Sequence, residues 1–270
     1  MAVITGLVKF VSAKEPVSEI LFFRFAGSLV LLSFVLRRSG GVSLLRTTQP
    51  LQHFIRTVCG MLSIGLYFLS IRSIPIADAT AISFSAPLFV LVFAVPLLGE
   101  QVSIRQWFMV FLGFCGMLLI ASPTGHHFGI GSIAAIGSAV FGAMVSIWLR
   151  RLSFRESVIT IAVLYNTTGT LILLCWLLVT DWTLNWDVYL LAMICIGLLG
   201  GVQQYTLTTA YRLTRASVLA PIEYSVLILV GLIGWYFWSE VPSIHALLGA
   251  FIVVVSSVFA TRYARQKPRM

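Results

Sequence analysis

The residues best suited to chemistry in this sequence are charged side chains placed inside long apolar runs. Glu223 and Arg24 each lie in such a run, and an ionisable group within a lipid-embedded helix is costly enough to indicate a function. Glu223 can pair with a cationic ligand group or carry a proton, and Arg24 can hold a carboxylate or gate a vestibule. The structural alternatives are an ion pair of Arg24 with Glu19 or Glu223, or an arginine that reaches the interface.

Neutral polar residues accompany these two charges. Gln203 and Gln204 follow a Gly-Gly pair, and glutamines in an apolar helix either hydrogen-bond a polar ligand or bridge helices. Tyrosines near helix ends commonly anchor a helix at the membrane interface, so the tyrosines are either such anchors or ligand-binding residues. The remaining candidates for a cavity wall are Tyr67, Ser83, Ser85, Tyr165, Asn166 and Tyr224.

Two prolines and two glutamates occupy matching places along the chain. Pro87 and Pro221 interrupt apolar runs. Because proline removes a backbone hydrogen bond and kinks a helix, we expect both to act as hinges, with packing kinks as the alternative. Glu100 and Glu240 close apolar runs, where a carboxylate stabilises the start of the next helix. We therefore assign these glutamates a structural role at helix ends.

The sequence does not contain the residue groupings that enzymes need. Its 4 histidines are scattered, and its 4 cysteines lie within apolar runs without metal-ligand spacing. A glycine-rich phosphate-binding loop with Lys and Ser/Thr is absent from the sequence. We predict no catalytic residue, no metal and no cofactor. A membrane-embedded enzyme and a membrane subunit without transport activity remain the alternatives from other functional classes.

Composition determines the surroundings of the chain. Hydrophobic residues make up 59% and charged residues 10%, whereas soluble domains carry about 25% charged residues. Such a surface needs a lipid bilayer, in which every backbone polar group must be paired internally. The apolar runs are continuous over about 20 residues, unlike the alternating strands of a barrel. We predict an all-α membrane protein, and we assign the net charge of +9 to loops rather than to nucleic-acid binding.

The pattern predicts about ten transmembrane helices. With the N-terminus inside, 14 basic residues fall on the inner side and 2 on the outer side, which matches the positive-inside rule. Both termini are therefore expected in the cytoplasm, with a basic tail over 263–270. The segments are 1–13, 17–36, 53–71, 77–98, 104–122, 129–149, 157–179, 187–211, 217–238 and 243–262.

The chain also contains an internal repeat with an offset of 140 residues. Five helices in each half place the halves in opposite orientations, as in the inverted repeats of secondary transporters, whose substrate lies between the halves near the midplane. The repeats are 1–122 and 129–262. The first segment is too short to span the hydrocarbon, so the first helix is predicted to be truncated. The matching positions are Arg72 with Arg212, Glu100 with Glu240, Ser103 with Ser243, and Ser83 with Glu223.

With these features the chain resembles the EamA-type members of the drug/metabolite transporter superfamily. The resemblance rests on residues 77–100, which run through Pro87 to Leu98-Gly99-Glu100, and on residues 216–240, which end in Trp238-Ser239-Glu240. It covers essentially the whole chain and departs at the short first helix and at Met109. The stretches that resemble the subgroup of S-adenosylmethionine uptake transporters are Glu19 with Phe22–Phe25, His53–Arg56, Ser83–Phe89 and Ala220–Tyr224.

The resemblance implies a secondary transporter of a small polar or zwitterionic metabolite in a bacterial inner membrane. It would work by alternating access, as a monomer or homodimer. S-adenosylmethionine uptake is the preferred interpretation, because Glu223 would receive its cationic group and Arg24 its carboxylate. Amino-acid export and riboflavin import by the same superfamily stay open, as do the direction of transport and the coupling ion.

Overall fold

The computed structural model describes residues 1–98, 104–121, 129–153, 156–180, 187–213 and 225–264. Within these ranges the regular elements are all helical, which confirms the predicted fold class. In chain order they are α1 (Ala2–Val11), α2 (Val17–Ser39), the 3₁₀ helix η1 (Gly41–Leu45), α3 (Pro50–Ser73), α4 (Ile76–Ser83), α5 (Ala86–Leu98), α6 (Ile104–Ala121), α7 (Ile130–Ser153), α8 (Val158–Leu177), α9 (Val188–Leu213), α11 (Ser225–Trp238) and α12 (Ile244–Ala264).

Local sequence signals set several helix ends. Gly40 ends α2 with a φ of 129°, a conformation that glycine adopts without strain. Pro50 begins α3, where its missing N–H is not needed. The Ser157 hydroxyl caps α8 by accepting a hydrogen bond from the backbone N–H of Thr160.

The chain has helices of the length that a bilayer requires. The described parts of α2, α3, α7, α8 and α9 contain 5 stretches long and apolar enough to cross a membrane. Shorter apolar stretches lie in α1, α4 with α5, α6, α11 and α12. The 10 residues of α1 span about 15 Å, half of a hydrocarbon core of about 30 Å. The predicted short first helix is thus present in the structure.

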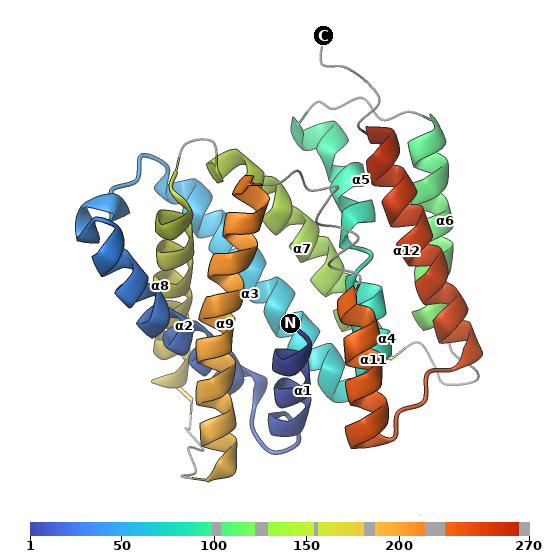
Figure 1. The fold of residues 1–270 in the computed structure, drawn as a ribbon, viewed down its shortest axis with the longest axis horizontal. Helices are drawn as coiled ribbons and strands as arrows, with labels where there is room; N and C mark the ends of the chain where they lie inside the picture. Colours follow the sequence, from blue (N-terminus) through green and yellow to red (C-terminus); the bar gives the residue numbers. More distant parts are fainter. Residues whose placement is uncertain (99–103, 122–128, 154–155, 181–186, 214–224, 265–270) are drawn as a thin grey trace.

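The two repeats are visible in the helix boundaries. Adding the offset of 140 residues moves α2 onto α8, α3 onto α9, α5 onto α11 and α6 onto α12. Counterparts also pack on one another, since α2 contacts α8 and α6 contacts α12. In Figure 1, α2, α3, α8 and α9 lie on the left, and α5, α6 and α12 lie on the right.

The segment predicted over 77–98 is two helices in the structure. It is interrupted at Phe84 and Ser85, between α4 and α5. The Ser85 N–H donates to the carbonyl of Ile82 at 3.0 Å, in a tight turn. Because Pro87 lacks an N–H and disfavours the helical conformation of the residue before it, the break falls where the sequence predicts an interruption.

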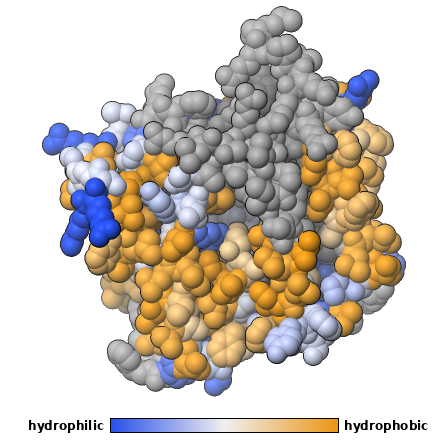
Figure 2. All heavy atoms as spheres, viewed as in Figure 1, coloured by the Kyte–Doolittle hydropathy of each residue, from blue (hydrophilic) through white to orange (hydrophobic). Residues whose placement is uncertain are grey.

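The outer surface of the bundle is apolar. Large side chains such as Phe34, Phe111 and Phe251 are 66%, 68% and 67% exposed. Figure 2 shows hydrophobic residues over most of the described surface on this face. An exposed apolar surface of this extent is what a lipid-facing bundle requires.

Candidate functional site

The helices on the left of Figure 1 enclose buried polar side chains. Arg24 on α2 and Arg56 on α3 are only 4% and 2% exposed, and Tyr165 and Asn166 on α8 are buried as well. A charged group inside a lipid-embedded bundle points toward a partner, a ligand or a water-filled path. These four residues are the centre of the candidate site.

Arg24 is held by α2 and α9. Its Nη1 donates a hydrogen bond of 2.6 Å to the Ser28 hydroxyl, which lies 2.9 Å from the carbonyl oxygen of Gly197. Gly200 provides the space, because a Cβ at that position would overlap the guanidinium. The burial of Arg24 contradicts the alternative in which this arginine reaches the interface.

Glu19, the predicted partner of Arg24, shares a hydrogen bond with Glu15, which precedes α2. The hydrogen bond of the Arg24 guanidinium joins it to a neutral hydroxyl.

Arg56 is a member of the site that the sequence analysis missed. Its guanidinium carbon lies 3.9 Å from the centroid of the Tyr165 ring, a cation–π contact. Nε and Nη1 are buried without a hydrogen-bond partner. Sequence reasoning counted this residue among the basic residues of the inner side, because it lies close to the start of its apolar segment. The position of Arg56, about one helical turn inside the apolar segment, could have indicated that it is a buried charge.

Tyr165 packs against residues of α2 and α3. Its ring packs edge-on against Phe25 at 5.0 Å, and Gly60 of α3 leaves room for it, since a Cβ there would lie 2.7 Å from the ring. Phe25 follows Arg24 in the sequence, so the predicted residues Arg24 and Tyr165 lie on helices that pack together.

Asn166 follows Tyr165 on α8. Its amide nitrogen donates to the carbonyl oxygen of Ala162 at 2.8 Å, and its Oδ1 is buried without a partner. His53, one turn before Arg56 on α3, likewise has both ring nitrogens buried without a hydrogen bond. Unsatisfied buried polar atoms are rare enough to need an explanation, such as a ligand or a water molecule.

Three other predicted residues lie apart from the arginines. The Tyr67 hydroxyl lies 3.2 Å from the Thr5 hydroxyl and 2.9 Å from that of Thr80, so it joins α3 to α1 and α4. Ser85 donates to the carbonyl oxygen of Ile82 at 2.7 Å, at the break between α4 and α5. The Ser83 hydroxyl is buried without a hydrogen bond.

The two glutamines lie on α9 and are half-buried. The Gln203 amide nitrogen contacts the sulfur of Met1. The Gln204 amide nitrogen lies 3.5 Å from the Thr208 hydroxyl, one turn further along the same helix. These contacts of the glutamines are thus with residues other than Arg24 and Arg56.

Several predicted residues cannot be placed. Glu100, Pro221, Glu223 and Tyr224 lie outside the described residues, and Pro87 is described only as part of the backbone of α5. Among the described residues, no group of three His, Cys, Asp or Glu side chains is arranged to hold a metal ion.

Glu240 joins the two repeats at one end of the bundle. Its Oε1 lies 3.0 Å from Lys9 Nζ, and its Oε2 accepts a hydrogen bond of 2.9 Å from the backbone N–H of Ile76, the first residue of α4. Lys9 also donates to the carbonyl oxygens of Ile71 and Ile74 at the end of α3. Glu240 thus caps the start of α4, and not the next helix of the chain as the sequence analysis expected.

A second contact joins the repeats at the opposite end of α3. The Thr47 hydroxyl donates to Glu156 Oε1 at 2.6 Å, and His53 Nε2 lies 4.0 Å from the same oxygen. Thr47 and His53 belong to the first repeat, and Glu156 precedes α8 in the second. The halves are therefore connected by polar contacts at both ends of the bundle.

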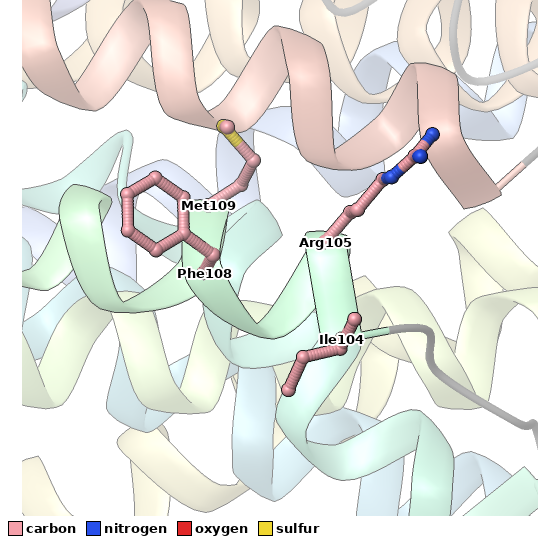
Figure 3. Close-up of a pocket in the computed structure, with 4 residues that line it drawn as sticks. All are labelled: Ile104, Arg105, Phe108 and Met109. Carbon is pink, nitrogen blue, oxygen red and sulfur yellow. The ribbon is translucent and has the colours of Figure 1, made fainter.

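The surface also has a shallow hollow at the start of α6, away from the buried arginines. Ile104, Arg105, Phe108 and Met109 line it (Figure 3). Ile104 and Phe108 are 83% and 60% exposed, and all four side chains come from a single helix. This hollow opens at the outer surface of the bundle.

Comparison with known proteins identifies relatives over the whole chain. The sequence profile of the EamA-like transporter family matches residues 1–122 and 129–262. A pseudopaline exporter of Pseudomonas aeruginosa is 33% identical over 97% of this chain and 92% of its own length. A riboflavin transporter of Vibrio cholerae is 27% identical over 99% and 91%. An S-adenosylmethionine uptake transporter of Rickettsia bellii is 26% identical over 93% and 86%.

A protein of known crystal structure has the same fold. It superimposes with a TM-score of 0.69 over 98% of this chain and 96% of its own chain, at 21% sequence identity. This similarity supports the architecture of the bundle and carries no information on substrate.

Proposed function

This chain belongs to the EamA-like transporter family, whose members are membrane transporters and not enzymes, and we propose that it is a secondary carrier for a small polar or zwitterionic metabolite. It works by alternating access in a bacterial inner membrane, with both termini in the cytoplasm. Arg24 holds a carboxylate of the substrate.

The burial of Arg24 is the observation that carries this proposal. The guanidinium is 4% exposed and its described hydrogen bond is to the neutral Ser28 hydroxyl. A buried cation is stabilised when an anion reaches it. A substrate carboxylate that enters between the halves supplies that anion, and Gly200 provides the space in which the guanidinium itself lies.

The contacts between the repeats support alternating access. One contact, Lys9 with Glu240, lies at the end of α3. The other, Thr47 with Glu156, lies at the start of α3. A site between inverted repeats opens to one side when the contacts at that side break. We assign Lys9 with Glu240 to the outer side and Thr47 with Glu156 to the cytoplasmic side, following the positive-inside rule.

S-adenosylmethionine is the first substrate to test, because it carries a carboxylate for Arg24 and because a relative is named as its uptake transporter. A second candidate is the export of pseudopaline, since the relatives with that name are 33% and 32% identical over 97% of this chain. Riboflavin is the third, from the relative in Vibrio cholerae.

The test is transport in proteoliposomes with labelled S-adenosylmethionine, pseudopaline and riboflavin, each offered from either side of the membrane. We expect saturable transport of one substrate by the wild type. Arg24→Gln abolishes it, while Arg72→Gln, which removes an exposed arginine of α3, leaves it intact. Glu223→Gln tests the predicted cation position. Transport that survives in Arg24→Gln would remove Arg24 from the site, and no transport of any substrate would contradict the carrier.

A further inference from the structure

Arg56 is a second buried cation whose charge no described side chain balances. It is 2% exposed, two of its guanidinium nitrogens have no hydrogen-bond partner, and its main contact is the face of the neutral Tyr165 ring. A cation–π contact contributes about 2 kcal/mol when desolvated, whereas burial of an unpaired charge costs several kcal/mol. An anion that reached the two free nitrogens would complete the arrangement seen among the described residues.

The two arginines lie at different depths in the bundle. Arg56 is six residues after the start of α3, about 9 Å from that end at a rise of 1.5 Å per residue. Arg24 is 15 residues before the end of α2, about 22 Å from the same side of the bundle. Tyr165, seven residues into α8, lies beside Arg56 and also packs on Phe25, the residue that follows Arg24.

Other buried polar groups lie near Arg56. His53 is one turn nearer the end of the bundle, on the same face of α3; its Nδ1 is buried without a hydrogen bond, and its Nε2 lies 4.0 Å from Glu156 Oε1. Asn166, next to Tyr165 in the sequence, has a buried Oδ1 without a hydrogen bond. Buried polar atoms thus extend inward from the start of α3.

We propose that Arg56 and Arg24 are two successive binding positions for the acidic groups of the substrate, and that the substrate is a small organic acid with a net negative charge. The inference rests on the proposed carrier function. Arg56 receives a carboxylate near the start of α3, and Arg24 receives one deeper in the bundle. S-adenosylmethionine, with a single carboxylate and two cationic groups, fits such a pair of positions less well than a dicarboxylate does.

The test is the thermal unfolding midpoint of the purified protein with succinate or citrate, compared with S-adenosylmethionine and with chloride at equal ionic strength. We expect the acids to raise the midpoint of the wild type and of Arg72→Gln. The shift is lost in Arg56→Gln and reduced in Arg56→Lys, which keeps the charge. Without added acid, Arg56→Gln unfolds at the wild-type temperature or above, because an unbalanced buried charge has been removed.

Three results would overturn the proposal. The first is that neither acid shifts the wild type, and the second is that the shift is unchanged in Arg56→Gln. The third is that the acids raise the unfolding midpoint of Glu223→Gln but not that of the wild type. In that case the Glu223 carboxylate itself would occupy the anion position in the wild type. If Arg56→Gln does not yield folded protein, Arg56→Lys decides, because an unchanged shift in that variant contradicts recognition by the guanidinium.

The outcome is separable from that of the carrier function. Saturable transport of S-adenosylmethionine with the same rate in Arg56→Gln would keep the carrier and remove the acidic substrate. Acid-dependent stabilisation that depends on Arg56, in a protein that transports neither the three compounds above nor labelled succinate or citrate, would support the two binding positions and count against the carrier.

Discussion

Two pairs of helices, α2 with α8 and α6 with α12, are built from different kinds of residues. Each pair joins a helix to its own counterpart in the other half. Between α2 and α8, Phe25 packs on Tyr165, and the neighbouring side chains of Arg24 and Asn166 on these two helices are buried. Between α6 and α12, Gly116 faces the Gly249 carbonyl and Ile252, so the backbones approach closely.

This difference shows how a duplicated bundle divides its tasks. Close approach at glycine maximises van der Waals contact, which is the main source of helix association in lipid. Buried charges and free polar atoms contribute little to packing and are retained where a ligand needs them. We therefore regard α6 with α12 as the scaffold and α2 with α8 as the site.

The largest expected effect is loss of stability on substitution of Gly116 by Leu. A Cβ at this position would already lie 2.8 Å from Ile252 and 2.9 Å from the Gly249 carbonyl oxygen, and overpacking of this kind costs about 3 kcal/mol. Thermal unfolding of purified protein measures it. The matched control is Gly231→Leu on α11, where no heavy atom lies within 4 Å of an added Cβ. Equal effects of the two substitutions would contradict the role of α6 with α12 as the scaffold.

The contact of Lys9 with Glu240 sharpens the comparison, because here two half-buried charges are paired. Lys9→Met or Glu240→Gln leaves one partner unsatisfied, and we expect each to lower stability by about 2 kcal/mol. The double variant should lose less than the sum of the two, since neither partner is then left alone. By contrast, Arg56→Gln is expected to cost no stability. If Lys9→Met and Glu240→Gln also left stability unchanged, as expected for Arg56→Gln, then ion pairing would not distinguish structural charges from functional ones.

A smaller effect is expected from Gly200→Ala, which alters the site without altering the scaffold. The added methyl group displaces the Arg24 guanidinium, and this flexible side chain can move. We expect KM for the transported substrate to rise about threefold, equivalent to about 0.7 kcal/mol, at an unchanged unfolding midpoint. An unchanged KM would indicate that the observed position of the guanidinium is not needed for binding.

The smallest effect concerns Glu15, next to α2 but outside the membrane-spanning helices. Burial raises the pKa of this carboxyl from its ordinary value of 4.5, and the charges of Glu19 and Asp187 raise it further. Glu15 therefore contributes most to stability below pH 4.5, and that contribution is lost as the pH rises through the folded-state pKa. Glu15→Gln should be more stable than the wild type at neutral pH and equal to it in acid. A difference that does not vary with pH would contradict this explanation.

Much of the fold could be predicted from the sequence, because lipid requires long apolar runs and each run becomes a helix. The interruption before Pro87 was also predictable, because proline lacks the N–H that a continuous helix needs. Glu240 was assigned to a helix end, but its actual partners, Lys9 and the start of α4, are remote in sequence. Such contacts depend on how the two repeats pack, which apolar runs do not encode.

The site was predictable only in part. Arg24 and Tyr165 were recognised by their chemical type within apolar segments, and the structure buries both. Arg56 was missed because the positive-inside rule does not distinguish a basic residue near the end of a segment from one in a loop. Its contact with Tyr165 is made by another helix, so only the packing of α3 on α8 distinguishes the two interpretations.

The unbalanced charge of Arg56 also has a kinetic consequence. An empty carrier must change conformation with this cation uncompensated in a low-dielectric interior, whereas a loaded carrier moves as a neutralised complex. We expect the return of the empty protein to be the slow step of the cycle. Unlabelled substrate on the far side should then accelerate uptake of the labelled compound, so that the protein works mainly as an exchanger.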